Sequence, residues 1–399
     1  MRNPQHISSC RVLLLCSCCA LLLLLLSAGV GRAQTGTWAA VTSMRPVNAL
    51  TVVDGVVFGA TSGGVLRYDP SRRKYTRFTR VDGLSGNRVL SVSLDPTGDL
   101  WFGTDGAGLS SLRPSEGRFA NPLRALDGLR INAVIGLDDR VLVGTDIGIS
   151  VLLTAHGRVK ETYRQLGGLS RDTEVHALAI HRGSLWAATA EGIAHASLDD
   201  ANLQDPDRWV SSRDMGATSS LLVHSDTLFG GGAAAAWRYD EDRAGWRPIG
   251  PLGKVDGLGS FGGPPKLVAV VRGQLQERQS DGTWVQRNVA GQVHSLTRGQ
   301  EQLWLGTDTG LAVLGSANPP RIRDTPNNQF FDIELGPAGQ LWVASMANDR
   351  EGEPAGIYRY DGSGWEVFGR AAGLSSDFAV SVVRDEIGRP WVATWGRGV

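Results

Sequence analysis

The chain has 399 residues, with 40 basic and 40 acidic side chains, 52 glycines, 12 tryptophans and four cysteines. This balance excludes the clustered basic charge by which proteins bind nucleic acid or an anionic membrane surface, so we expect no nucleic-acid partner. Abundant glycine beside an ordinary 42% of apolar residues indicates a folded, turn-rich chain rather than disorder or a membrane bundle.

Residues 1–33 have the layout of a secretory signal peptide. Arg2 and Arg11 supply the positive charge, Val12–Leu26 the apolar run, and Gly31–Ala33 a small-x-small cleavage site. The alternative, an uncleaved membrane anchor, needs about 20 apolar residues. We therefore predict an exported protein, periplasmic or extracellular, without a membrane span after cleavage. All cysteines precede residue 20, so the mature chain would have no disulfide, thiol nucleophile or cysteine-bound metal.

From residue 38 onward one short motif recurs about every 42 residues, a period typical of repeat folds. Its clearest copies are Trp101-Phe-Gly-Thr104, Trp186-Ala-Ala-Thr189 and Trp304-Leu-Gly-Thr307. We name the position of the first residue the Trp slot. It is filled by Phe58, Trp101, Leu142, Trp186, Phe229, Trp304, Trp342 and Trp391, with a degenerate copy near Val268. A bulky residue repeated once per unit is expected to pack against the adjacent unit.

Each unit divides into short β-like runs separated by turn residues. In the second unit, runs at 88–94, 100–103 and 109–112 and a strand starting near Phe119 are separated by turns at 96–98, 105–108 and 114–117. Four strands per period predict an all-β fold, a β-propeller of about 7–9 four-stranded blades over residues 34–399. The ninth unit stops before its third strand, so we expect the last blade to be incomplete.

Tryptophans also mark the fourth strand of several units. Trp209, Trp246, Trp284 and Trp365 begin such strands, and Trp38 stands 20 residues before Phe58 in the same relation. Trp38 is therefore predicted to lie on an outer strand that completes a blade from the other end of the chain, which would hide an open edge.

The residues Asp82-Gly-Leu84-Ser-Gly-Asn87, followed by Asp95-Pro-Thr-Gly98-Asp-Leu-Trp101, resemble the two-component regulator propeller repeat. That resemblance implies an exported sensor region, as in hybrid histidine kinases, although the repeat also occurs in exported proteins without a kinase. A propeller similar to streptogramin lyase is the competing resemblance and would imply an enzyme. A third alternative is a structural or adhesion protein whose C-terminal sorting domain is missing.

Signals for catalysis are weak. The histidines beyond residue 33 form no His-Glu-x-x-His pattern, and no nucleophile elbow or phosphate-binding loop is present. Asp105, Asp146 and Asp308 follow the repeated threonines, but one carboxylate per unit, with units about 42 residues apart, is ordinary turn chemistry rather than a calcium site. We predict a non-enzymatic protein with no catalytic residue, no metal and no cofactor.

Loops on a rigid scaffold are the usual place for binding. Antiparallel alternation puts the loops between units and the Thr-Asp turns on the same face, which also receives the irregular insertions. The candidate residues of this face are Arg88, Arg130, Phe330 and Arg350. We expect a small molecule, a glycan or a protein as partner; the alternative is that these are solvated loops.

Overall fold

The computed structural model describes residues 40–120, 122–299, 302–316, 320, 325, 328–345 and 356–399. The predicted signal peptide, Trp38 and Arg350 lie outside these residues. Within them the chain forms strands and five short 3-10 helices, η1 (Arg80–Asp82), η2 (Pro206–Arg208), η3 (Glu241–Arg243), η4 (Pro337–Gly339) and η5 (Arg370–Ala372). No helix in this described part is long and apolar enough to cross a membrane.

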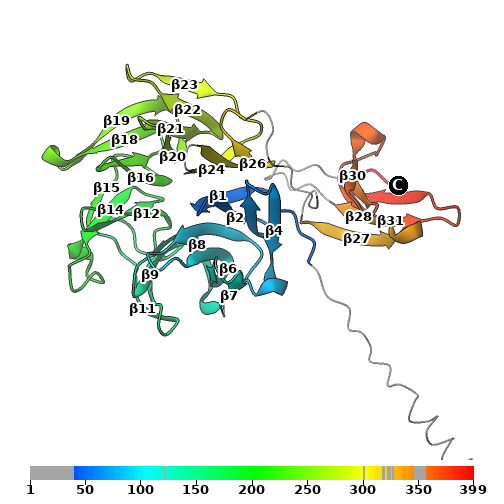
Figure 1. Ribbon diagram of the computed structural model, residues 1–399, viewed down its shortest axis with the longest axis horizontal. Coiled ribbons are helices and arrows are strands. Elements are labelled where there is room, and N and C mark those ends of the chain that lie inside the picture. Colours follow the sequence, from blue (N-terminus) through cyan, green and yellow to red (C-terminus); the bar gives the residue numbers. More distant parts are fainter. Residues whose placement is uncertain are drawn as a thin grey trace, which may run out of the picture. The chain divides into compact units, whose positions relative to one another are not determined.

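The strands follow the repeat, and we number the successive groups of antiparallel strands among the described residues as blades 1 to 9 in chain order (Figure 1). Blade 1 contains β1 (Val47–Val53), β2 (Val56–Thr61), β3 (Gly64–Asp69) and β4 (Lys74–Phe78). Blade 2 contains β5 (Val89–Leu94), β6 (Leu100–Arg113) and β7 (Arg118–Phe119). Blade 3 contains β8 (Leu123–Gly136), β9 (Arg140–Thr145), β10 (Gly148–Leu153) and β11 (Arg158–Tyr163).

The next three blades each have four strands. Blade 4 contains β12 (Val175–His181), β13 (Ser184–Thr189), β14 (Ile193–Ser197) and β15 (Val210–Ser212). Blade 5 contains β16 (Ser220–His224), β17 (Thr227–Gly231), β18 (Ala235–Asp240) and β19 (Gly245–Leu252). Blade 6 contains β20 (Val255–Phe261), β21 (Lys266–Val271), β22 (Gln274–Arg278) and β23 (Trp284–Arg287).

The last three blades differ in strand number among the described residues. Blade 7 contains β24 (Val293–Arg298), β25 (Leu303–Thr307) and β26 (Gly310–Val313). Blade 8 contains β27 (Phe330–Leu335), β28 (Leu341–Ser345), β29 (Gly356–Tyr360) and β30 (Trp365–Phe368). Blade 9 contains β31 (Ala379–Arg384) and β32 (Pro390–Thr394).

Seven blades close a ring. Their innermost strands β1, β5, β8, β12, β16, β20 and β24 neighbour one another in this order, and β24 contacts β1 again. At the closure the Ser295 hydroxyl donates to the Val47 carbonyl at 3.2 Å, and Trp304 of blade 7 packs with Val47 and Leu50 of blade 1. Blades 8 and 9 pack against each other through β27, β28 and β31. The assignment of all residues 34–399 to one propeller stays a prediction.

The expected turn at residues 105–108 of the second unit is wrong. β6 continues through it, because the first half of β8 pairs with β6 at Asp105 with Arg130, Ala107 with Asp127 and Leu109 with Leu123. Gly108, with a φ of 74°, permits the bend, since a Cβ there would stand 2.4 Å from the Leu123 carbonyl oxygen. Blades 2 and 3 therefore share one continuous sheet.

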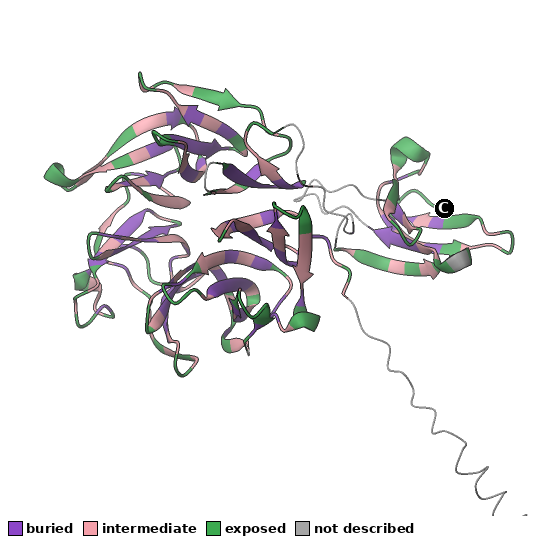
Figure 2. Cartoon of the chain, in the orientation of Figure 1, coloured by how far each residue is buried: buried purple, intermediate pink, exposed green. Residues whose placement is uncertain are grey.

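The Trp-slot residues lie between blades, where each side chain packs on the innermost strand of the following blade. Trp101 contacts Ile131 and Val134 of blade 3 in this way. Six slot residues are at most 8% exposed, namely Phe58, Trp101, Leu142, Trp186, Trp304 and Trp342, while Phe229 is partly buried. In Figure 2 the ring strands are mainly purple or pink and the turns green. Trp391 departs from the expected packing: it is 50% exposed because no described blade follows β31 and β32.

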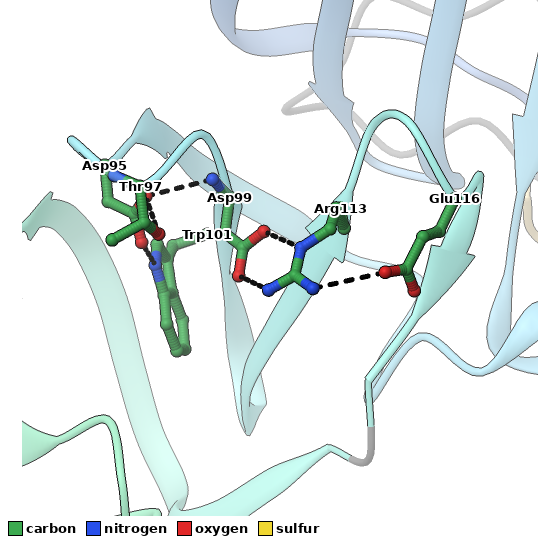
Figure 3. Close-up of polar contacts among 6 residues, drawn as sticks. All are labelled: Asp95, Thr97, Asp99, Trp101, Arg113 and Glu116. Carbon is green, nitrogen blue, oxygen red and sulfur yellow. Dashed lines mark hydrogen bonds and ion pairs between the residues drawn. The ribbon is translucent and has the colours of Figure 1, made fainter.

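A tether fixes the indole of Trp101 (Figure 3). Asp95 accepts a hydrogen bond from the indole Nε1 at 2.7 Å with one carboxylate oxygen, and from Thr97 and the Asp99 amide with the other. Burial raises the pKa of Asp95, but the hydrogen bonds from Trp101 and Thr97 outweigh it and the pKa is lowered. Hydrogen bonds among residues 95–101 thus fix the orientation of the Trp101 ring without help from a neighbouring blade.

Candidate binding site at the channel mouth

Nearly every innermost strand of the ring carries a β-bulge at the same place. The pairing register shifts around Asn48, Leu90, Asn132, His176, Asp256 and His294. A bulge inserts one extra residue and re-aims its side chain, and bulges are frequent beside functional sites. In blade 5, Ser219 stands directly before β16 at the corresponding place.

These seven residues line one cavity of about 480 Å³, together with Arg130, Glu174 and Lys254, which stand two positions before a bulge residue. Each blade of the ring contributes at least one of the ten side chains, so the cavity lies where all seven innermost strands converge. We name it the channel mouth. Its volume falls in the range typical of small-molecule sites.

A hydrogen-bonded network joins blades 3 and 4 at the channel mouth. The Asn132 amide nitrogen donates to Glu174 Oε1 at 2.9 Å and to the Val175 carbonyl at 3.1 Å. Its amide oxygen accepts from Arg130 Nε at 3.1 Å. Asn132 therefore holds Arg130 and Glu174 in place and presents an arginine and a carboxylate side by side.

His176 is fixed in one tautomer by its neighbour. Its Nδ1 lies 3.0 Å from the Thr218 carbonyl oxygen, which can only accept, so Nδ1 carries the proton. Nε2 then holds the lone pair of the neutral ring, 3.7 Å from Glu174 Oε2. His176 thus offers an acceptor to a ligand, and it would pair with Glu174 when protonated.

Blade 6 adds a second pair of opposite charges to the channel mouth, and blade 7 adds a histidine. Lys254 Nζ contacts Asp256 Oδ1 at 2.9 Å. His294 is exposed, yet the surrounding protein desolvates it and lowers its pKa, against the opposing effect of Asp308 and Asp256. The lowered pKa favours the neutral form of the His294 imidazole.

The chemistry of the channel mouth is polar and balanced in charge. Arg130 and Lys254 are matched by Glu174 and Asp256, and Leu90 is the apolar member among otherwise polar or charged lining residues. Such a site suits a ligand with several hydrogen-bonding groups and little net charge, because an apolar ligand would leave these groups unpaired.

The structure describes three of the four residues predicted for the binding face. Arg130 lines the channel mouth, and Arg88 stands at the equivalent position of blade 2, paired with Asp105 at 3.3 Å. Phe330 begins β27 in blade 8 and is 40% exposed, and Arg350 lies outside the described residues. Whether any of them binds a ligand stays a prediction.

The carboxylates of the Thr-Asp turns serve the backbone. Asp146 accepts from the Arg130 amide at 3.3 Å, and Asp308 accepts from the Gln292 amide at 2.9 Å. They hold the start of an innermost strand against the turn of its own blade. Across the described residues no three His, Cys, Asp or Glu side chains are grouped to hold a metal ion.

Sequence reasoning missed Asn48, Asn132, His176, Asp256 and His294. Each follows a buried β-branched residue at the start of an innermost strand, as in Val175-His176 and Val293-His294. Aligning the units on their Trp slots would have revealed most of this set, because Asn48, Asn132, His176 and His294 each stand ten residues before a Trp slot, whereas Asp256 stands twelve before Val268. Motif searches could not, since neighbouring members stand about 40 residues apart.

Comparisons with known proteins agree with this architecture. Residues 83–106 match the family model described as two component regulator propeller, which confirms the resemblance on one repeat unit. PorZ, a bacterial surface component of the type-IX secretion system of Porphyromonas gingivalis, is similar with a TM-score of 0.70 and 19% identity over 90% of this chain and 51% of PorZ. No curated protein matches the sequence.

Two further structures have a similar fold. The extracellular domain of a hybrid two-component system of B. thetaiotaomicron is similar with a TM-score of 0.58 and 15% identity, over 88% of this chain and 50% of that one. Streptogramin B lyase is similar with a TM-score of 0.54 and 14% identity, over 70% of this chain and 95% of the lyase. These likenesses confirm the predicted propeller fold. The chain spans about half the length of PorZ and of the two-component domain.

Proposed function

We propose that this chain is an exported, non-enzymatic β-propeller that binds a small polar ligand at the channel mouth and acts as a sensing module outside the cytoplasm. One observation carries the proposal: all seven ring blades direct a side chain from equivalent positions into one cavity of about 480 Å³. The regulator-propeller match and the fold shared with an extracellular two-component domain support the sensing role.

The balanced charge of the site favours a neutral or zwitterionic ligand. Arg130 and Lys254 supply donors, whereas Glu174, Asp256 and the Nε2 atom of His176 supply acceptors. Sugars and free amino acids present both kinds of group at this size. A multiply charged ligand would meet a like charge on one side of the site.

An enzyme is the second candidate, and a specific observation favours it. Two histidines and two carboxylates line the same cavity, His176, His294, Glu174 and Asp256, and streptogramin B lyase shares the fold. A histidine with a fixed tautomer and a free Nε2 is suited to accept a proton. The two functions differ in outcome, because a binding module leaves its ligand unchanged.

The test is a titration of the purified chain with a panel of mono- and disaccharides and the free amino acids, followed by calorimetry or ligand-observed NMR. Arg130→Met and Asp256→Asn should weaken binding of any positive compound at least about tenfold, as expected for loss of a charged hydrogen bond. Arg158→Met, at the exposed start of β11 in the same blade as Arg130, is the matched control.

Binding that both channel-mouth variants leave unchanged would contradict the site, and a panel without a single binder would contradict the ligand class. Mass spectrometry of a bound compound after long incubation separates the two functions. Recovery of intact ligand supports a binding module, whereas conversion that His176→Gln abolishes supports the enzyme.

A further inference from the structure

Several innermost strands of the ring carry a charged residue two positions before the bulge, which we name the rim position. These rim residues are Arg88, Arg130, Glu174 and Lys254. The rim cations of blades 2 and 6 pair with a carboxylate of their own blade, Asp105 at 3.3 Å and Asp256 at 2.9 Å. Among the described residues, no ion pair joins Arg130 to a carboxylate or Glu174 to an arginine or lysine.

Asn132 stands between these two charges. Its amide oxygen accepts from Arg130 Nε at 3.1 Å, and its amide nitrogen donates to Glu174 Oε1 at 2.9 Å. The same nitrogen donates to the Val175 carbonyl at 3.1 Å, which fixes the amide against blade 4. These contacts use one atom of each charged group, so Nη1 and Nη2 of Arg130 and Oε2 of Glu174 can contact a ligand. A single amide group separates the two charges, and one small molecule can therefore reach both.

Two hydrogen-bond acceptors face each other in blade 4. Oε2 of Glu174 lies 3.7 Å from Nε2 of His176. Nε2 carries the lone pair of the neutral ring, because Nδ1 donates to the Thr218 carbonyl at 3.0 Å. Two acceptors cannot hydrogen-bond each other, whereas an ammonium group has several N–H donors and can donate to both. Blade 4 thus presents a place for an ammonium beside the guanidinium of blade 3.

The lining of the channel mouth favours a charged ligand over a sugar. A sugar ring has a face of C–H groups, and burying that face is favourable against an apolar or aromatic surface. Leu90 is the apolar member of the lining, and no Phe, Tyr or Trp of the described part of the chain lines this cavity. Charged groups also gain more from a charged partner, because such hydrogen bonds are roughly twice as strong as neutral ones.

We propose that the channel mouth binds a free α-amino acid, whose carboxylate contacts Arg130 and whose ammonium contacts Glu174 and His176. An α-amino acid carries both charged groups on one carbon atom, which matches two charges separated by one amide group. The planar guanidinium binds a carboxylate through two parallel N–H donors, here those of Nη1 and Nη2. This inference rests on the proposed function, because it assigns the ligand class of the same cavity.

Derivatives that lack one charge test the assignment by isothermal titration calorimetry. Each common L-amino acid is titrated into the purified chain, and the tightest binder is compared with its N-acetyl form, which has no ammonium, and its carboxamide, which has no carboxylate. Both derivatives should bind at least about tenfold more weakly, since a charged hydrogen bond is lost. A dipeptide of the same residue, whose two charges stand farther apart, should also bind more weakly.

Variants assign each end of the amino acid to its partner. Glu174→Gln keeps an acceptor for Asn132 but removes the charge, so it should bind the free amino acid and the N-acetyl form with similar affinity. Arg130→Met should likewise lose the preference for the free amino acid over its carboxamide. Asp138→Asn removes an exposed carboxylate in the turn after β8 and is the matched control, which should retain both preferences.

The outcomes distinguish this inference from the proposed function. A sugar whose binding Arg130→Met weakens, in a panel where no amino acid binds, would overturn the inference and leave the proposed function intact. Equal affinity of the unmodified chain for an amino acid and its N-acetyl form would also overturn the inference alone. A panel without a binder of either kind, or binding that no channel-mouth variant alters, would contradict both.

Discussion

The ring of blades 1 to 7 and the pair of blades 8 and 9 are built from the same repeat but differ in what covers each blade. Trp101 and Trp391 show the difference most directly. Both follow an aspartate by six residues, and both donate their indole nitrogen to it. One is buried against Ile131 and Val134, and the other is half exposed. The local motif orients the side chain, whereas burial depends on a neighbouring blade.

The largest expected effect comes from truncating these two tryptophans. Trp101→Ala should lower the free energy of unfolding by about 3–5 kcal/mol, because it leaves a cavity between blades 2 and 3. Trp391→Ala should cost below about 1 kcal/mol, as a half-exposed side chain loses little packing. Urea unfolding with hydrogen exchange resolved by peptide measures both. Equal losses would show that the tether, and not the neighbour, determines the stabilisation.

A smaller loss of stability is expected from substituting Gly103, the residue directly before Thr104. A Cβ on Gly103 would stand 2.2 Å from Cγ2 of Ile131, so Gly103→Ala should destabilise blade 2 by about 1–3 kcal/mol through overpacking. Blade 8 carries Ala344 at this place, opposite the smaller Ala379. Adding Ile131→Ala to Gly103→Ala should therefore cost less than the sum of the two single changes. Strict additivity in a double-mutant cycle would reject this compensation.

The repeated threonines Thr104 and Thr394 should behave alike in both regions. Thr104 donates to the Gly108 carbonyl at 2.7 Å and Thr394 donates to the Gly398 carbonyl at 2.8 Å. Replacing either with valine should cost about 1 kcal/mol, since one net hydrogen bond is lost within residues 104–108 or 394–398. Peptide-resolved hydrogen exchange of these two segments measures the loss. A cost confined to Thr104→Val would mean that the ring, rather than the local segment, sets the strength of this bond.

The smallest expected effect is the stabilisation that is lost when acid protonates Asp385. Desolvation raises the pKa of Asp385, but hydrogen bonds from Arg389 and Trp391 outweigh it and hold the value at about 2, against an ordinary 3.8. Because the folded-state pKa is depressed, its stabilisation is complete above pH 3.8 and is lost as the pH falls through about 2. Trp391 fluorescence should change with that midpoint, and Asp385→Asn should abolish the change. An unaltered titration in the variant would assign it to other carboxylates.

The sequence predicted the repeat, the strand order and the burial of most Trp slots, because each depends on residues within one unit or the next. Ring closure could not be predicted this way. It rests on contacts between segments about 250 residues apart, such as Ser295 with Val47. The exposure of Trp391 was missed for the same reason, since its motif is intact and only the neighbour differs.

The candidate site was predicted only in part. Arg130 was found because the repeat pattern assigns it to a loop between units, although it lies within β8, but the bulge residues beside it were not found. A bulge leaves no mark within a single strand, since Val175-His176 reads as ordinary alternation. The continuous pairing of β6 with β8 was hidden similarly, because Gly106 and Gly108 signal a turn as readily as a bend.

The bulges affect how the ligand specificity of such a protein can evolve. In each innermost strand the residues on either side of the bulge pack between blades, while the bulge residue itself faces the cavity. Packing and recognition are therefore assigned to different residues of the same strand. Asp256 and His294 can be exchanged without disturbing an apolar contact between blades, whereas Asn48, Asn132 and His176 also hydrogen-bond a carbonyl of the following blade. A descendant could acquire a new ligand by a few such exchanges while its scaffold stays the same.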